Sequence, residues 1–256
     1  MIRRVADEVA ARLGAHASRH APQGSGAVLE EAEDTGRCEI FPDPGPERTL
    51  ERGYIPIGVS ARHCHVTAEQ VEILFGKGAA LEPLKPLKQT GQFAAKQTVS
   101  IIGPRGRALE RVRILGPARS ETQVEVSLTD CIQLGIEPPV RPSGDHRGTP
   151  GLLMVGPAGH LAMERGVIRA NRHVHLSTEE AALLGLRDRQ TVLLKVDGDR
   201  PVLFYDVQVR VAPNFRAELH LDTDDANAVG LGAGAVAQLV RSLGDIPDCG
   251  CLVRGG

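Results

Sequence analysis

Two segments of the chain carry the same pattern, Arg-His-x-His, at Arg62–His65 and at Arg172–His175. In an extended strand, residues i and i+2 face the same side, so each pattern aims two imidazoles at one spot. Two imidazoles placed in this way can chelate one metal ion. A single His-x-His is a weak signal, because a histidine pair on a strand more often packs or faces solvent. Two copies in one chain favour two metal sites.

A third candidate ligand follows each pattern. When the chain is aligned with itself, Val124–Asp130 matches Leu219–Asp225, which sets Glu125 against His220. We therefore predict two sets of ligands, His63, His65 and Glu125 in the first and His173, His175 and His220 in the second. These ligand types suit two Zn2+ ions best, although other divalent metals such as cobalt, manganese, nickel and iron also fit. Three protein ligands leave a fourth position open on each ion, as in catalytic zinc sites.

Each His-x-His is expected to end a strand directly before a helix. Thr67 with Gln70, and Ser177 with Glu180, have the spacing of a capping box, and apolar residues follow at helical spacing. A helix N-terminus concentrates backbone N–H groups and the positive end of the helix dipole. An anionic ligand is therefore favoured near each pair of imidazoles.

From Tyr54 onward the chain consists of short β-branched segments, such as Gly166–Leu176 and Pro201–Val211, punctuated by Gly, Pro and Asp. Such a pattern, with few and short helices, predicts a mainly β protein. Because the His-x-His scheme is repeated, we expect two related β-barrel domains with short capping α-helices and a dinuclear metal site between them. No G-x-G-x-x-G follows a strand and no P-loop is present, so a nucleotide-binding fold has no support.

Composition excludes several classes of function. Hydrophobic residues make up 41% of the chain and charged residues 24%, as in ordinary globular proteins. A net charge of -2 and an aromatic content of 3% give no basis for binding nucleic acid. No apolar run approaches the roughly 20 residues that span a bilayer. The first residues lack the apolar core of a secretory signal, and five cysteines at scattered spacings suit a reducing compartment. We expect an intracellular protein without a membrane partner.

The N-terminal stretch differs from the rest. Apolar residues recur at helical spacing in Met1–Leu13, which predicts an amphipathic helix within residues 1–14. Residues 15–52 are rich in Pro, Gly and acidic side chains and predict a flexible linker. A helix on such a tether either docks on a partner or folds back onto its own domain.

Seven separated motifs resemble the PduL-type phosphate acyltransferases, also called phosphate propanoyltransferases or phosphotransacylases. They occur in the family's order over roughly Tyr54 to Val240 and comprise Ile57–His65, Gly91–Ala95, Leu115–Arg119, Gln123–Ser127, Ser143–Asp145, Arg172–Leu176 and His220–Asp224. The resemblance implies reversible transfer of a propanoyl or acetyl group between coenzyme A and inorganic phosphate. It implies zinc at the two ligand sets and places Arg119 at the phosphate. Cys64 and His146 depart from the family's usual apolar residues.

The resemblance also implies how the chain is organised. Residues 53–61 would join residues 171–256 in one β-barrel domain, residues 62–170 would form the other, and the protein would be a homo-oligomer. Several family members carry a short N-terminal helix on a linker that encloses them in bacterial microcompartments. We therefore expect residues 1–14 to bind shell proteins and place the enzyme in the microcompartment lumen, or otherwise in the cytoplasm.

Two other functions fit the same ligands. A dinuclear zinc hydrolase would attack a thioester or phosphoester with a metal-bound hydroxide. A binding module without catalysis would hold its metal ions in closed coordination. No Ser-His-Asp triad or Cys-His dyad is visible in the sequence, so a covalent acyl-enzyme is not expected.

Overall fold

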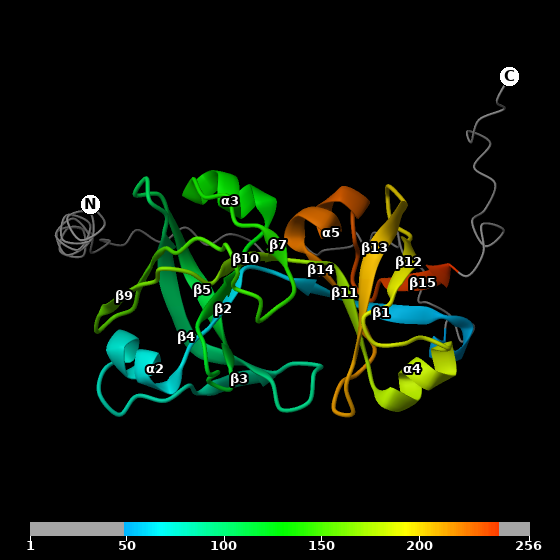
Figure 1. Ribbon diagram of the computed structural model, residues 1–256, viewed down its shortest axis with the longest axis horizontal. Coiled ribbons are helices and arrows are strands. Elements are labelled where there is room, and N and C mark those ends of the chain that lie inside the picture. The colour runs from blue at the N-terminus through cyan, green and yellow to red at the C-terminus, as the bar shows by residue number, and fades with distance from the viewer. Residues whose placement is uncertain (1–48, 241–256) are drawn as a thin grey trace, which may run out of the picture. The chain divides into compact units, whose positions relative to one another are not determined.

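The two His-x-His segments form the short strands β2 (His63–His65) and β11 (His173–Leu176) in the computed structural model, which describes residues 49–240 (Figure 1). The helix predicted within residues 1–14 lies outside the described residues, as does the predicted linker up to residue 48. The last residues of the predicted linker form a single 3-10 turn, η1 (Leu50–Arg52). None of the helices in residues 49–240 has the length and apolar composition that crossing a membrane requires.

The described residues are mainly short strands separated by helices of two turns. The strands before residue 170 are β1 (Tyr54–Ser60), β2, β3 (Pro83–Pro86), β4 (Phe93–Ile102), β5 (Ala108–Gly116), β6 (Gln123–Glu125), β7 (Val140–Arg141), β8 (Leu153–Val155), β9 (His160–Ala162) and β10 (Val167–Ala170). The later strands are β11, β12 (Thr191–Val196), β13 (Val202–Val211), β14 (Glu218–Asp222) and β15 (Val236–Val240). The helices are α2 (Ala68–Phe75), α3 (Leu128–Leu134), α4 (Thr178–Leu184) and α5 (Thr223–Val229). The prediction of a mainly β protein with short helices is confirmed.

One sheet closes into a barrel of six strands in the order β1-β14-β11-β13-β12-β15. The blue strand β1 in Figure 1 completes it, pairing with β14 in parallel and with β15 antiparallel. Side chains alternate between buried and partly exposed along β14, which is the pattern of a strand with one face in a core. Val174, Leu194 and Leu219 are fully buried in the barrel's core. The polar residues of the same strands therefore face outward.

The other sheet has nine strands and does not close. Its order is β7-β10-β6-β2-β5-β4-β8-β9, with β3 paired to β4. No pairing within residues 49–240 joins β7 to β9, so the expectation of a second closed barrel is wrong for the hydrogen-bonded sheet. Pro138, Pro139 and Pro142 flank β7 and have no N–H to donate, which restricts this strand to a two-residue edge.

The predicted strand Gly166–Leu176 is two strands in the structure. Its first part, β10, pairs with β6 in the open sheet, and its second part, β11, pairs with β13 and β14 in the barrel. The break falls at Asn171 and Arg172, where the chain passes from one sheet to the other. A continuous β-branched run predicts one strand, because local composition does not show a change of sheet.

The surroundings of β2 and β11 repeat one another. β2 pairs antiparallel with β6, which sets His63 opposite Glu125, and β11 pairs antiparallel with β14, which sets His173 opposite His220. The helix after each His-x-His strand starts with a complete capping box, as predicted. The helices α3 and α5, which follow the third ligands, both end at a glycine with φ 71°, Gly135 and Gly230. A residue with a Cβ adopts this left-handed conformation only at a cost.

Two sets of hydrogen bonds join the part of the chain that contains the open sheet to the part that contains the closed barrel. Gln89, between β3 and β4, donates through Nε2 to the Arg216 carbonyl and to Glu218 Oε2, and its Oε1 accepts from the Arg216 N–H. Asp224 Oδ2 accepts from the Thr129 N–H at 2.8 Å. Thr129 and Asp224 occupy matching positions in the two halves of the self-alignment, so the repeat units meet at equivalent residues.

Candidate metal and substrate site

The first predicted ligand set is brought together by strands β2 and β6. His63, His65 and Glu125 have potential ligand atoms within 4.8 Å of one another, and Glu125 Oε2 lies 3.6 Å from His63 Nε2. His63 Nδ1 donates to the Ala61 carbonyl at 2.9 Å, and His65 Nδ1 donates to the Leu115 carbonyl at 3.2 Å. A carbonyl only accepts, so these bonds place a proton on each Nδ1 and leave Nε2 as the nitrogen that can bind a metal ion.

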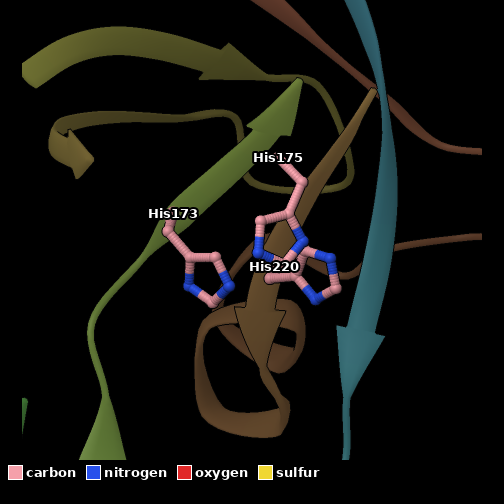
Figure 2. A group of neighbouring side chains, drawn as sticks. All are labelled: His173, His175 and His220. Atoms are coloured by element: carbon pink, nitrogen blue, oxygen red, sulfur yellow. The ribbon is translucent and has the colours of Figure 1, made fainter. Parts of the chain in front are cut away.

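The second set comes from strands β11 and β14. His173, His175 and His220 also have ligand atoms within 4.8 Å of one another, and Figure 2 shows their rings gathered at one spot. The His173 and His220 rings stack with centroids 4.8 Å apart, and the His175 ring lies 4.6 Å from that of His220. His173 Nδ1 donates to the Asn171 carbonyl at 2.8 Å, as His63 does to Ala61 in the first set.

The second set contains buried nitrogen atoms that lack a partner. Within residues 49–240, neither His175 Nδ1 nor His220 Nε2 makes a hydrogen bond. Glu218 Oε2 lies 3.1 Å from His220 Nε2 without meeting the angular criterion of a hydrogen bond, so His175 Nδ1 is the nitrogen that has neither a hydrogen bond nor an ion-pair contact within residues 49–240. Leaving a buried polar atom unsatisfied costs about 1–3 kcal/mol. A metal ion at the centre of the three rings would supply the missing interaction, so these residues fit a divalent cation.

The electrostatics keep most of these imidazoles neutral. Burial is the main cause that lowers the pKa of His175 to about 2, and neighbouring His173 and His220 lower it further. Burial likewise lowers the pKa of His173 and of His65 to about 3. Neutral imidazole is the form that binds metal, so three of the ligands need lose no proton at neutral pH.

Glu125 and His63 behave as a coupled pair. Burial opposes the charge of the Glu125 carboxylate, but His63, His65 and His173 together outweigh it and hold the pKa of Glu125 below its ordinary value. Burial also opposes the charge of His63, and Glu125 outweighs it and raises the pKa of His63. A carboxylate that stays ionised in a buried site is a suitable ligand for a cation.

Both ligand sets open into one cavity of about 540 Å³. Its wall contains all six predicted ligands together with Arg119, so the structure brings every predicted site residue to a single place. Arg119 Nη1 donates to Ser143 Oγ at 3.3 Å. Burial lowers the pKa of Arg119, while the nearby Glu125 carboxylate acts against this effect. The cavity therefore combines candidate metal ligands with a guanidinium that suits an oxyanion.

Gln123 is a further candidate site residue, which the sequence did not predict. Its Nε2 donates to Glu125 Oε1 at 2.6 Å and to Ser143 Oγ at 2.8 Å, and its Oε1 accepts from the Gly144 N–H at 2.7 Å. His146 Nε2 lies 3.1 Å from the same Oε1, so His146 belongs to this network although its spacing suggested no partner. The available signal was that Gln123 and Glu125 are i and i+2 on one strand.

Arg210 and Phe215 also line the cavity and were not predicted. The Phe215 ring lies 4.2 Å from that of His175. Arg210 stands opposite His175 in the parallel pairing of β13 and β11. Both residues reach the site through pairing and loop contacts that spacing along the sequence does not show.

Comparison with known proteins agrees with the motifs. Residues 56–232 match the family model described as phosphate propanoyltransferase. The phosphate propanoyltransferase of Thermotoga maritima is 51% identical over 188 residues, which cover 73% of this chain and 89% of that protein. The enzyme of that name from Planctopirus limnophila is 48% identical over 196 residues, covering 76% of this chain and 79% of the relative. The phosphate propanoyltransferase of Lachnoclostridium phytofermentans is 47% identical over 186 residues, which cover 73% of this chain and 87% of that protein. The resemblance seen in the motifs is confirmed, and the chain belongs to the phosphate propanoyltransferase family.

Proposed function

We propose that the protein catalyses reversible transfer of a propanoyl or acetyl group between coenzyme A and inorganic phosphate. Acyl-CoA and HPO4(2-) give acyl phosphate and CoA-SH: a C–O bond forms, the C–S bond breaks, and the phosphate's proton ends on the thiol sulfur. Membership of the phosphate propanoyltransferase family supports the reaction class. The observation that carries the proposal for this chain is that both ligand sets and Arg119 face one cavity.

We further propose that His63, His65 and Glu125 hold one divalent metal ion and that His173, His175 and His220 hold another, both zinc. When bound, such ions act as Lewis acids that stabilise negative charge on oxygen or sulfur. The chain's contribution is to fix the orientation of the rings, through the Nδ1–H bonds of His63 and His173 to backbone carbonyls. The unpartnered Nδ1 atom of His175 supports this assignment.

Arg119 is proposed to bind the phosphate. Its planar fork of N–H donors matches two oxygen atoms of a phosphate, and its partner Ser143 holds it at the cavity wall. Arg119→Lys keeps the charge and loses the fork. We expect this variant to raise the KM for phosphate several-fold or more while the metal content per chain stays unchanged.

Direct attack of phosphate on the thioester is favoured over an acyl-enzyme. Cys64 lies between two candidate ligands but faces the core, where it is fully buried, and burial raises the pKa of its thiol to about 12. Burial also raises the pKa of Cys131 to about 11. Neither of these described cysteines can supply a thiolate at neutral pH.

The wider assignments rest on the sequence. We propose that residues 1–14 bind microcompartment shell proteins, that the enzyme acts in that lumen, and that it is a homo-oligomer. We also propose residues 53–61 plus 171–256 as one domain and residues 62–170 as the other. The pairing of β1 with β14 and β15 supports this division.

One assay tests the reaction. Thiol release from acetyl-CoA and propanoyl-CoA is followed with a chromogenic disulfide, with and without phosphate, and acyl phosphate is trapped as the hydroxamate. We expect release that requires phosphate, an equal amount of hydroxamate, and two metal ions per chain by elemental analysis. Thiol release that proceeds equally without phosphate would instead identify a hydrolase and overturn the proposal.

A further inference from the structure

Arg210 lines the cavity from strand β13 of the closed barrel, whereas Arg119 follows strand β5 of the open sheet. It lies on β13, whose residues Val207 and Val209 are fully buried in the barrel core. Because alternate residues face opposite sides of a strand, Arg210 faces away from that core and toward the cavity that it lines. The parallel pairing with β11 places it directly opposite His175.

The cavity wall carries more positive than negative side chains. Its cationic residues are Arg62, Lys88, Arg113, Arg119, Arg172 and Arg210, and its carboxylates are Glu125, Glu218 and Asp222. Most of the guanidinium groups have partners in the protein. Arg62 pairs with Asp130, Arg172 with Asp225, and Arg113 donates to two backbone carbonyls. Arg119 donates to Ser143.

Arg210 differs from the other arginines of the cavity wall, because its guanidinium group has no such partner within residues 49–240. Among residues 49–240 it makes neither a hydrogen bond nor an ion pair through its side chain. Burial lowers the pKa of Arg210, and although Glu125 and Asp188 attract it, neither comes within ion-pair distance. A partly desolvated guanidinium with five unused donors is costly unless an anion supplies the acceptors.

Arg119 and Arg210 also act on one another. Arg210 is one of the charges that lower the pKa of Arg119, which means that two like charges are held in the same cavity. An anion with several oxygen atoms bound in this cavity would offset the repulsion and offer acceptors to the guanidinium groups that line its wall. A phosphoryl group has this shape and charge.

We propose that Arg210 binds a phosphoryl group of the substrate, as a second guanidinium that acts together with Arg119. The inference rests on the proposed function and deepens it, because it assigns a substrate-binding role on the barrel side of the cavity. Phosphoryl groups reach this site from two sources, inorganic phosphate with its acyl phosphate product and the phosphates of coenzyme A.

The test compares Arg210→Gln, which removes the charge and nearly keeps the size, with Arg210→Lys, which keeps the charge without the fork. Arg187→Gln is the matched control, because Arg187 is exposed and does not line the cavity. Steady-state kinetics give separate KM values for phosphate and for acyl-CoA, with dephospho-CoA and pantetheine thioesters as truncated substrates. Thermal unfolding with increasing phosphate, or with sulfate as a tetrahedral dianion, measures anion binding without turnover. Metal content is measured in parallel.

We expect Arg210→Gln to raise the KM for phosphate about 10-fold or more and to abolish most of the phosphate-induced rise in Tm, with unchanged metal content. Arg210→Lys should fall between this variant and the parent. A rise confined to the KM of acyl-CoA, absent with the pantetheine thioester, supports the proposal with coenzyme A as the source. Unchanged KM values and an unchanged anion-induced rise in Tm in a folded Arg210→Gln protein would overturn it. If the parent itself shows no phosphate-dependent transfer, the proposed function fails, and the Tm series still decides whether Arg210 binds the anion.

Discussion

Gln123 and Glu218 occupy equivalent positions in the two halves of the chain, and each contacts the third candidate ligand of its own half. Gln123 Nε2 donates to Glu125 Oε1 at 2.6 Å, and Glu218 Oε2 lies 3.1 Å from His220 Nε2. The neighbour matches the chemistry of the ligand in each half: the Gln123 amide donates to the Glu125 carboxylate, and the Glu218 carboxylate lies beside the His220 imidazole. The repeat therefore includes a polar neighbour of the third ligand in each half, and in the first half this neighbour donates a hydrogen bond to the ligand.

Replacing Gln123 tests this orienting contact. Gln123→Met removes the amide that donates to Glu125 Oε1 and nearly keeps the size of the side chain, and because Glu125 then loses its orienting hydrogen bond, we expect the affinity of the first ligand set for Zn2+ to fall about 10–100-fold. Metal titration of chelator-treated protein, with a fluorescent zinc indicator as competitor, measures this affinity. The second ligand set should keep its affinity and serves as the control within the same molecule. Equal weakening of both sets would show that the substitution acts through general unfolding.

The sequence predicts the two ligand sets because their geometry is local. Residues i and i+2 of a strand share a face, so His63 and His65 had to point together once the segment was extended. The self-alignment added Glu125 and His220. This information does not include which strands become neighbours, so it missed the break at Asn171 and the open edge at β7.

The same limit explains the missed site residues. Gln123 meets Ser143 and Gly144 from a distant loop, and Arg210 meets the site through the pairing of β13 with β11. Alternation along β13 indicates that Arg210 lies on the polar face of its strand. Only the pairing shows that this face borders the candidate metal ligands.

The ion pair of Arg172 with Asp225 is expected to stabilise the second ligand set. Arg172 Nε and Nη2 each lie 2.8 Å from a different oxygen atom of Asp225, which ties the residue before His173 to the helix after His220. We expect Asp225→Asn to lower the free energy of unfolding by about 1–2 kcal/mol, since the pair is bidentate but partly exposed. Asp206→Asn is the matched control. Asp206 also pairs with Arg172 but is half exposed, so its loss should cost less than about 0.5 kcal/mol. Urea unfolding of the three proteins gives these values, and equal effects of both substitutions would contradict the expectation.

Removing one imidazole from each set should release one metal ion at a time. We expect His63→Ala and His175→Ala each to bind one Zn2+ per chain in place of two and to lose acyl transfer by a factor of about 1,000 or more, because the proposed reaction uses both ions in one cavity. Elemental analysis and the hydroxamate assay check the two statements separately. His160→Ala is the control, because His160 is exposed on β9 and lies outside the cavity. A variant that keeps full activity with one ion per chain would remove the need for a dinuclear site.

The lowered pKa values of the histidines predict how the metal-free protein responds to acid. The pKa is about 2 for His175 and about 3 for His173 and His65, mainly through burial, whereas the ordinary value is 6.5. The unfolded chain therefore binds more protons than the folded chain between about pH 3 and pH 6.5. The stability from these neutral imidazoles is fully present above pH 6.5 and is lost as the pH falls below it.

We expect the free energy of unfolding of chelator-treated protein to fall by up to about 1.4 kcal/mol per pH unit for each of these histidines between pH 6 and pH 4. His63 does not add to this loss, because attraction to Glu125 raises its pKa and keeps it protonated in the folded chain over this range. Urea unfolding at pH 7, 6, 5 and 4 measures the slope. His173→Gln should reduce it by the share of one histidine, whereas His160→Gln should leave it unchanged. A slope that is the same in His173→Gln as in the parent would mean that this buried imidazole does not set the acid sensitivity.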